Sequence, residues 1–363
     1  MPKAHHSGLS CVADFGFPVR PQELKIEITA ACNLRCSFCY LGDEDWQAAP
    51  HLPEDEVFRW IDWAVDNQIP AVRFTGGEPT LHPRLKVFCG YARLQQRYVI
   101  LNTNGMGAER LYQELFPVVA DLRVSLPTLD SRRLDAISGG QGVLKQKLAV
   151  IQQALSAGLQ RVSLLTTLLP EDKGKLEAFV KFVQTSEQLH WLPLRYEPTP
   201  QLPRPWTRGD AQDFAEEMAA LMDRYPEHAR GIFLAVPFCA VRPTGLGARV
   251  FAGRVRNCGP YVALNVNVRG QLQACFGVCE LPGPPGTLAE VKNRPELWAV
   301  CSRSALPEEC QRCPYVGHCA GGCRKPAGLV EYRGRYVDYL AGFLEEKSPG
   351  SVQPFGRGAN PVA

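Results

Sequence analysis

The sequence predicts an α/β protein: a partial (β/α)6 TIM barrel followed by a small cysteine-rich domain. From residue 24 to about residue 225, short apolar runs alternate six times with longer amphipathic stretches. Such alternation is typical of a parallel sheet with helices packed outside it. Six units are too few for the eight of a closed barrel, so we expect an incomplete one. Beyond residue 230 helical patterns thin out, Gly and Pro become frequent, and nine of the 14 cysteines follow.

Six apolar runs are the expected strands: Leu24–Thr29, Ala71–Thr75, Tyr98–Asn102, Leu122–Leu126, Arg161–Leu165 and Trp191–Tyr196. Between them, apolar residues recur at steps of three and four, which predicts amphipathic helices. The repeats are Leu144, Leu148, Ile151 and Leu155, then residues 176–183 and 214–222. The Pro-rich stretch 197–206 predicts a loop that crosses to the sixth helix.

These patterns divide the chain into four parts. We expect an N-terminal extension over residues 1–21, the barrel over 22–230, the cysteine-rich domain over 231–340 and a flexible tail over 341–363. The 20 residues before the first strand are short for a separate module that would bind a leader peptide.

Composition argues against several classes of protein. The 45% hydrophobic and 21% charged residues are typical of a globular protein, and 40 basic side chains nearly balance 37 acidic ones. Without a basic run longer than Arg132–Arg133, neither nucleic acid nor a membrane surface is an expected partner. The sequence has no signal peptide and no apolar stretch near ~20 residues, so we expect a cytoplasmic protein with reduced thiols. Its cysteines are therefore candidate metal ligands.

Three cysteines lie together on the loop that follows the first strand: Cys32, Cys36 and Cys39. This is the carboxyl end of the strand, where α/β folds bind ligands. A cysteine triad fits an iron–sulfur cluster with one iron left open. The alternative is a zinc site that borrows a distant fourth ligand.

Two further segments end at the same edge of the expected sheet. Gly76, Gly77, Glu78 and Pro79 follow the second strand; the glycines would let a ligand approach the backbone, and Glu78 offers a carboxylate. An ordinary strand-to-helix turn is the alternative for this segment. Ser125 follows the fourth strand.

Together these motifs resemble the radical S-adenosylmethionine (SAM) superfamily. Cys32, Cys36, Phe38 and Cys39 match its Cys-x3-Cys-x-aromatic-Cys signature, and residues 76–79 match its GGEP segment. The resemblance covers about residues 24–230 and implies a radical SAM enzyme. It implies that the three cysteines bind a [4Fe–4S] cluster and that SAM completes the open iron. Reductive cleavage of SAM would then give a 5′-deoxyadenosyl radical that abstracts a hydrogen from the substrate.

The same resemblance implies roles for other residues. The segment Gly76–Pro79 would hold the SAM amino group, Phe38 and Tyr40 would lie near the adenine, and Ser125 near the ribose or carboxylate. Asn104, in "NTNG", is expected to face the same cavity. One position departs from peptide-modifying relatives, which carry Arg in a "DxxRG" segment: here "DAISG" (135–139) has Ser138 instead.

A second cysteine group reads Cys310-x2-Cys313-x5-Cys319-x3-Cys323, with Cys258 and Cys275 upstream. A structural zinc ribbon is the simple alternative. With residues 286–298 as a connector, the arrangement resembles the SPASM domain that follows many radical SAM cores. That resemblance implies one or two auxiliary iron–sulfur clusters.

The ligand sets implied for these clusters are incomplete. One cluster would take Cys258, Cys275 and Cys323, with Cys239 or Cys279 as the fourth ligand. The other would take Cys310, Cys313 and Cys319 plus a later cysteine, but none follows Cys323. Asp338 or His318 could replace it, the cluster could keep an open iron, or it could be absent. Cys11, Cys89 and Cys301 are expected to be buried apolar residues.

The function expected from these resemblances is oxidative modification of a peptide or protein side chain, such as a crosslink, a dehydrogenation or a related maturation. A flavodoxin or ferredoxin would donate the electron. One alternative is a dehydrogenase or epimerase of a sugar or cyclitol; another is an iron–sulfur scaffold that cleaves no SAM. No general base is assigned, although Asp130 and Glu197 lie near strand ends, and His82 is expected to be a helix-start residue.

Overall fold

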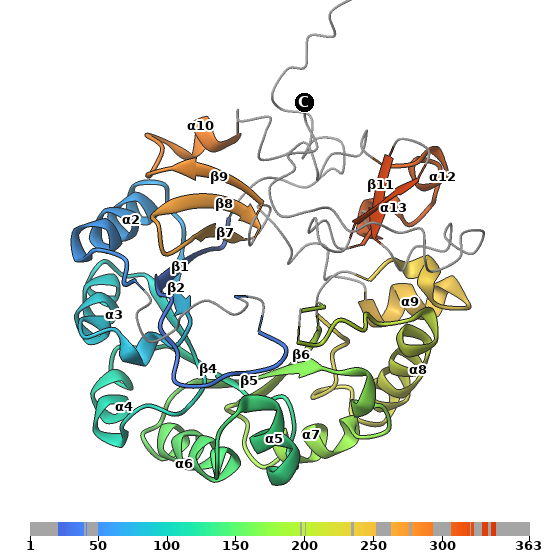
Figure 1. The fold of residues 1–363 in the computed structure, drawn as a ribbon, viewed down its shortest axis with the longest axis horizontal. Helices are drawn as coiled ribbons and strands as arrows, with labels where there is room; N and C mark the ends of the chain where they lie inside the picture. The colour runs from blue at the N-terminus through green and yellow to red at the C-terminus, as the bar shows by residue number, and fades with distance from the viewer. Residues whose placement is uncertain are drawn as a thin grey trace, which may run out of the picture.

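The main sheet of the protein is an open ring of nine strands in the order β6-β5-β4-β3-β2-β1-β7-β8-β9 (Figure 1). The computed structural model describes residues 21–39, 41, 50–196, 198–199, 201–233, 236–251, 263–275, 278–292, 306–319, 321–322, 329–332 and 335–338. Strands β6 and β9 are the two ends of the sheet, so the ring does not close. The predicted partial barrel is confirmed.

Six strands pair in parallel in chain order: β1 (Glu23–Thr29), β2 (Ala71–Gly76), β3 (Tyr98–Thr103), β4 (Asp121–Ser125), β5 (Arg161–Leu168) and β6 (Leu189–Arg195). All six were predicted, although some boundaries differ by up to three residues. On the other side of β1 the sheet continues with β7 (Ala263–Val266), β8 (Gln271–Cys275) and β9 (Val278–Pro282). Strands β10 (Leu329–Tyr332) and β11 (Arg335–Asp338) form a separate pair.

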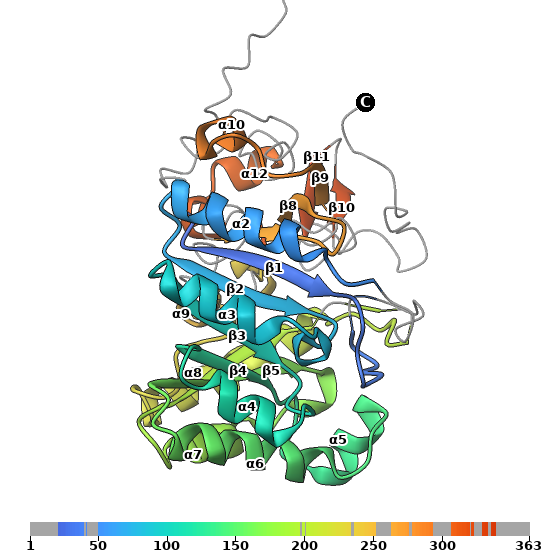
Figure 2. The ribbon, with the colours of Figure 1, turned by 90° about the vertical axis from the view of Figure 1, so that its left-hand side faces the viewer.

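Helices cover the convex side of the sheet (Figures 1 and 2). Those that follow strands β1–β6 or alternate with them are α2 (Glu54–Asp66), α3 (Leu85–Leu94), α4 (Glu109–Leu115), α6 (Val143–Ser156), α7 (Leu176–Val183) and α8 (Arg208–Arg224). The other helices are η1 (Pro79–Leu81), α5 (Ser131–Ser138), η2 (Pro170–Asp172), η3 (Phe238–Ala240), α9 (Thr244–Phe251), α10 (Leu288–Lys292), α12 (Glu308–Gln311) and α13 (Val316–Cys319). Among the described residues, no helix is long and apolar enough to cross a membrane.

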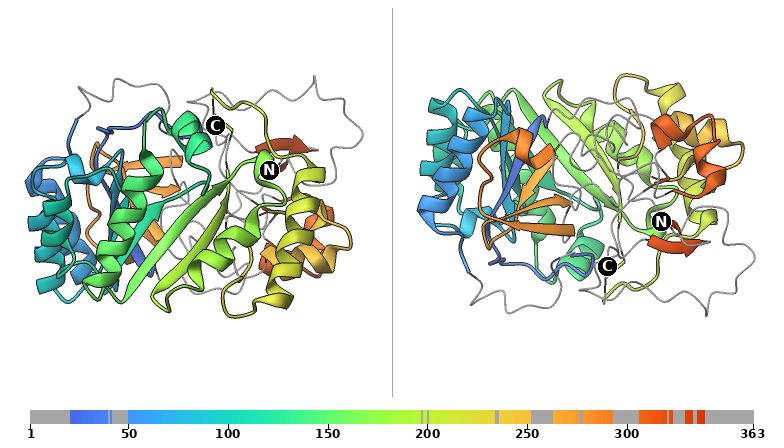
Figure 3. Two further views of the ribbon diagram at one scale, coloured as in Figure 1. Left: turned by 90° about the horizontal axis from the view of Figure 1, so that it is seen from below. Right: turned by 90° about the horizontal axis from the view of Figure 1, so that it is seen from above.

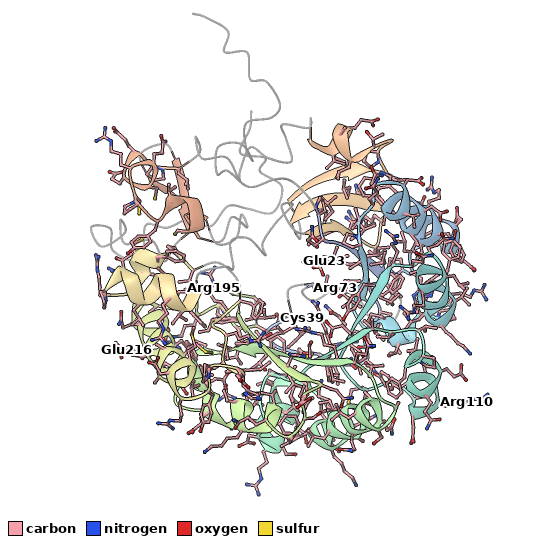
Figure 4. The ribbon with its side chains drawn as sticks, turned by 180° about the vertical axis from the view of Figure 1, so that it is seen from behind. Glu23, Cys39, Arg73, Arg110, Arg195 and Glu216 are labelled. Carbon is pink, nitrogen blue, oxygen red and sulfur yellow. The ribbon has the colours of Figure 1, made fainter. Side chains whose placement is uncertain are left out.

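The two faces of each strand differ in chemistry. In β1, Leu24, Ile26 and Ile28 are fully buried against the helices, whereas Glu23 and Lys25 point to the inside of the ring. Figure 4 shows Glu23, Arg73 and Cys39 on this inner side, while Arg110 and Glu216 lie on the outer rim. The apolar core therefore lies between sheet and helices, and the inner face is polar.

One helix departs from its expected pattern. The stripe Leu144, Leu148 and Leu155 of α6 is only partly buried, although Ile151 is buried as expected. Lys147, in the middle of this helix, is 2% exposed. Sequence periodicity could not reveal it because a lysine is normally placed on the solvent face.

The N-terminus of α8 carries a reciprocal cap. Asp210 accepts hydrogen bonds from the backbone N–H and the hydroxyl of Thr207 at 2.7 and 2.8 Å, and Thr207 Oγ1 accepts from the N–H of Asp210 at 3.0 Å. Lys173 and Arg204 pair with the same carboxylate. Burial acts to raise the pKa of Asp210, but these bonds and charges outweigh it, so the pKa lies below its usual value.

We expect Asp210→Ala to lower the free energy of unfolding by about 1–2 kcal/mol at pH 7, because it removes the cap. The stabilisation is complete above the unfolded pKa of about 3.9 and disappears as the pH falls through the lower pKa of the folded state, so the effect of the substitution should shrink below about pH 4. Urea unfolding at pH 7 and at about pH 2.5 measures this. Asp213→Ala, an exposed acid on the same helix, is the control and should change stability by less than about 0.5 kcal/mol. Equal losses for both variants would contradict the role given to the cap.

Candidate functional site

The loop after β1 brings three thiols together at the carboxyl end of the sheet. Cys32, Cys36 and Cys39 are free, partly buried cysteines, and the charge of each of the other two acts on Cys36. Among the described residues, no three metal-ligating side chains converge as a single ion would need. A cubane differs because each thiolate binds a different iron. Three thiols around a common space fit that requirement.

Backbone hydrogen bonds hold this loop on two sides. The N–H groups of Gly77 and Glu78 donate to Thr29 O and Ala31 O at 2.8 and 2.7 Å. On the other side, the N–H groups of Arg35 and Ser37 donate to the last turn of α5 at 2.9 Å each. The Thr199 hydroxyl also donates to Ser37 O at 2.7 Å. The loop is thus fixed by strand β2, helix α5 and the segment after β6.

Glycine is required at two of these contacts. A Cβ on Gly76 would lie 2.1 Å from Thr29 O, and φ there is +133°; a Cβ on Gly77 would lie 2.2 Å from Ala31 O. The sequence suggested that these glycines admit a ligand, and in the structure the group that approaches them is the backbone of the cysteine loop. Absence of side chains lets β2 and the loop touch.

Glu78 is completely buried and faces the protein rather than an open cavity. Its carboxylate accepts hydrogen bonds from the hydroxyls of Thr80 and Thr103 at 2.7 and 2.8 Å, and from the Asn104 N–H at 2.6 Å. Burial raises its pKa, against the opposing effect of these bonds. Glu78 therefore ties the end of β2 to the end of β3, and Pro79 is buried as the first residue of η1.

Asn104 connects β3 to the cysteine loop. Its side-chain NH2 donates to Asn33 Oδ1 at 2.7 Å and to Cys32 Sγ at 3.8 Å, and its Oδ1 accepts from the Met106 N–H at 2.8 Å. An N–H directed at a cluster thiolate is one of the features that tune a cluster's reduction potential. These contacts place Asn104 beside the cysteine loop, while its expected position facing the SAM cavity stays a prediction.

Lys147 is a site residue that the sequence did not reveal. Its ammonium donates to Asn104 O and to Ser125 O, the latter at 2.7 Å, so it joins the ends of β3 and β4. Its side chain passes beside Gly105, where a Cβ would lie 3.2 Å from Lys147 Cγ. Burial lowers its pKa to about 8, and the nearest charges that oppose this effect are those of Cys36, Glu78 and Cys32.

Burial dominates the chemistry of the three thiols. It raises the pKa of Cys36 to about 12 and that of Cys39 to about 11, and it also raises the pKa of Cys32. Lys147 acts in the opposite direction on Cys36. The metal-free thiols therefore keep their protons at neutral pH, and a metal that binds them must displace those protons.

The remaining predicted site residues have structural contacts within the fold or lie outside the described residues. Phe38 packs at the edge of the core, and Ser125 ends β4 with its carbonyl on Lys147. Ser138 is buried, its hydroxyl donating to Leu134 O at 2.6 Å, so this position supplies no cation. Asp130 caps α5, and His82 ends η1 with its ring near Leu52 O. Tyr40 and Glu197 lie outside the described residues.

The second cysteine group is described only in part. Cys239 lies in η3, Cys310 in α12, Cys313 just after it, Cys319 at the end of α13 and Cys275 at the end of β8. Cys258, Cys323, Cys11 and Cys301 lie outside the described residues, and so do the side chains of Cys275, Cys279, His318 and Asp338. Cys89 is fully buried in α3, as expected.

The inner face of the ring carries both signs of charge. Arg73 pairs with Glu23, and Asp121 accepts from Arg123 Nε at 2.7 Å and lies 3.6 Å from Arg161 Nε. With Lys25 and Glu27, strands β1–β5 place four cations and three carboxylates on this face. A molecule that enters the ring below the cysteine loop would contact both positively and negatively charged side chains.

We expect Gly76→Ala to release the cysteine loop, because the new Cβ would collide with Thr29 O in a backbone conformation that alanine rarely adopts. Stability should fall by more than about 2 kcal/mol, and iron retained after anaerobic reconstitution should fall with it. Thermal unfolding and iron analysis measure both.

Gly142→Ala is the matched control, because Gly142 also has a positive φ of +64° but has no atom within 4 Å of the new Cβ. It should cost about 1 kcal/mol and leave the iron content unchanged. An equal iron loss in both variants would show that the close approach at Gly76 is not what holds the loop.

Sequence comparison adds a family match. Residues 26–183 match the model of the Radical SAM superfamily. Among curated relatives, GTP 3',8-cyclase of Corynebacterium glutamicum is 30% identical over 217 residues, 56% of this chain and 56% of that protein. GTP 3',8-cyclase of Streptomyces coelicolor is 36% identical over 154 residues, 41% of this chain and 45% of that one. The chain thus spans about half the length of these relatives.

Solved structures share the fold at low sequence identity. Streptococcus suis SuiB bound to S-adenosylmethionine has a TM-score of 0.69 at 16% identity, covering 86% of this chain and 75% of SuiB. SuiB bound to its precursor peptide SuiA gives 0.68 at 16% identity over 86% and 74%. The enzyme anSMEcpe with bound AdoMet gives 0.61 at 16% identity over 85% and 90%.

The SPASM assignment of the second domain stays a prediction. The cysteine loop, the GGEP segment and the partial barrel lie in their expected places, and residues 26–183, which contain both motifs, match the Radical SAM superfamily.

Proposed function

We propose that this radical SAM enzyme abstracts a hydrogen from a peptide or protein side chain bound inside the partial barrel, and that the net reaction is an oxidation. The main support for a peptide or protein substrate is the inner face of β1–β5, which bears both positively and negatively charged side chains. Each arginine on that face is already opposed by a carboxylate: Arg73 by Glu23, and Arg123 and Arg161 by Asp121. Such a wall suits a peptide, which brings both signs of charge.

Cys32, Cys36 and Cys39 would hold a [4Fe–4S] cluster, whose open iron binds SAM in this superfamily and whose electron converts SAM into a hydrogen-abstracting radical. The chain's own residues orient this site. Asn104 directs an N–H at the sulfur of Cys32, and the backbone of Gly76–Glu78 fixes the loop. The SAM contacts predicted for Gly76–Pro79, Phe38, Tyr40 and Ser125 remain part of this proposal.

The second part of the proposal concerns residues 231–340, beyond a barrel over 22–230. A SPASM-type domain there would hold one or two auxiliary clusters. Cluster potentials span roughly a volt, so such a cluster can accept the electron left on a substrate radical. A flavodoxin or ferredoxin would reduce the SAM site. SuiB, a neighbour in fold, has been solved with a precursor peptide, which supports a peptide substrate for this chain.

A nucleotide is the second candidate substrate, because curated relatives are named GTP 3',8-cyclase. The inner face has four cations, which favours an anion, but three carboxylates share it. A triphosphate carries only negative charge and would lose much of this attraction to the carboxylates. The peptide is therefore the better match.

The first prediction of this proposal is SAM cleavage. Anaerobic reconstitution with iron and sulfide, followed by SAM and dithionite, should give 5′-deoxyadenosine, measured by chromatography. Cys36→Ala should abolish it, because two thiolates cannot hold the cluster with its open iron in place. Cys89→Ala, which removes a thiol from the core, should keep it. If Cys36→Ala still forms 5′-deoxyadenosine, the proposed mechanism is wrong.

The substrate class has its own test. Addition of GTP should neither raise the rate of 5′-deoxyadenosine formation nor consume the GTP, as followed by chromatography of both compounds. A stoichiometric conversion of GTP would replace the peptide with the nucleotide.

The last prediction concerns Lys147. Its buried positive charge lies near Cys36 and Cys32, so it should favour addition of an electron to the cluster. Lys147→Met should make the reduction potential of the SAM-site cluster more negative, as measured by redox titration followed by electron paramagnetic resonance. Lys145→Met, which removes an exposed lysine of the same helix, should leave it unchanged. A shift of equal size in both variants would contradict this role.

A further inference from the structure

Helix α13 lies against η3, although 80 residues separate Cys319 from Cys239. The backbone N–H of Phe238 donates a hydrogen bond to Cys319 Sγ at 3.4 Å. The ring of Phe238 meets that of Tyr315 edge to face, with centroids 6.0 Å apart. Figure 1 and the view from above in Figure 3 both show α13 on the same side of the ring as α9 (Thr244–Phe251).

Close backbone packing fixes η3 at this contact. Phe238 is 1% exposed, and a Cβ on Gly247 of α9 would lie 2.6 Å from Phe238 O. The chain enters a tight turn here, because the Ala240 N–H donates to Pro237 O at 2.9 Å. Cys239 is therefore held at a defined position, one residue from the N–H that binds the sulfur of Cys319.

The remaining thiols of the group come from the same short region. The Cys313 N–H donates to Cys310 O at 3.1 Å, so these two residues share one turn. The Cys319 N–H donates to Tyr315 O at 2.8 Å, which places Cys319 on the next turn. Burial raises the pKa of Cys319 to about 12, and the charges of Cys239 and Cys313 add to this rise, so both of these thiols lie within electrostatic reach of Cys319.

We infer that Cys239 is the fourth thiolate of an auxiliary iron–sulfur cluster whose other ligands are Cys310, Cys313 and Cys319. This inference rests on the proposed function and completes a ligand set that the sequence left open. From the sequence, Cys239 or Cys279 was expected to join Cys258, Cys275 and Cys323, and Asp338 or His318 was the candidate for the missing ligand of the other cluster. The contact between Phe238 and Cys319 places it upstream instead.

A complete thiolate set has a chemical consequence. Four protein thiolates saturate the four irons of a cubane, so no iron is left to bind a substrate. This cluster would exchange electrons only, in contrast to the cluster on the loop after β1, which has three thiolates. A zinc ion is the competing occupant of four thiolates, but it needs them to converge on one point. The metal content measured in the test below distinguishes the two occupants.

The test counts iron in the full-length chain purified without oxygen. The background is Cys32→Ala/Cys36→Ala/Cys39→Ala, which removes the SAM-site cluster and leaves the auxiliary iron. Three variants are then made in it: Cys239→Ala, Cys313→Ala and the two combined. Cys89→Ala is the control, and Cys239→Ser replaces Cys239→Ala if the latter does not fold. Iron, zinc and sulfide are measured after exposure to an iron chelator.

Each single variant keeps three thiolates and leaves one iron open to the chelator, so it should lose between one and about four irons per chain relative to the background. The combined variant should lose no more than about four, because both residues bind the same cluster. Cys89→Ala should lose none. The inference is overturned if Cys239→Ala behaves like Cys89→Ala, if the combined variant loses clearly more than about four irons, or if zinc or no metal is found in the background. Any of these results leaves SAM cleavage by the wild-type chain intact, so failure here is distinct from failure of the proposed function.

Discussion

The contact on which the site depends is the crossing of two backbones at the end of β2. Gly76 and Gly77 lie directly against Thr29 O and Ala31 O, and two N–H groups of this segment donate to those carbonyls. Any side chain at these positions would push the cysteine loop away from the sheet. The three thiols are consequently held by the main chain of the barrel, which is the most rigid support that the fold offers.

Two buried charged side chains also hold the site together. Glu78 and Lys147 are both inaccessible to water, and each is satisfied by groups from neighbouring strand ends. Burial of an unpaired charge is costly, so these contacts fix the ends of β2, β3 and β4 relative to one another. The result is an edge of the sheet whose geometry hardly depends on a bound cofactor.

The two cysteine regions are built in different ways. The first uses consecutive residues of one loop, and three thiols leave one iron of a cluster open. The second joins η3 to a segment 80 residues later, through the hydrogen bond from Phe238 to Cys319. In the proposed enzyme, the first would bind SAM and the second would carry electrons.

The sequence by itself determined the six parallel strands, the order of their helices, the cysteine loop and the GGEP segment, because periodicity and short spacings are local properties of a chain. It also suggested Asn104, since "NTNG" follows a strand. Only the tertiary structure decided that Gly76 and Gly77 lie against the backbone of Thr29 and Ala31, that Glu78 is fully buried and joins the ends of β2 and β3, and that Lys147 reaches the site from a helix. The tertiary structure also decided that Cys319 lies against η3, where it accepts a hydrogen bond from the Phe238 N–H. Residues about 80 positions apart meet only when the fold brings them together.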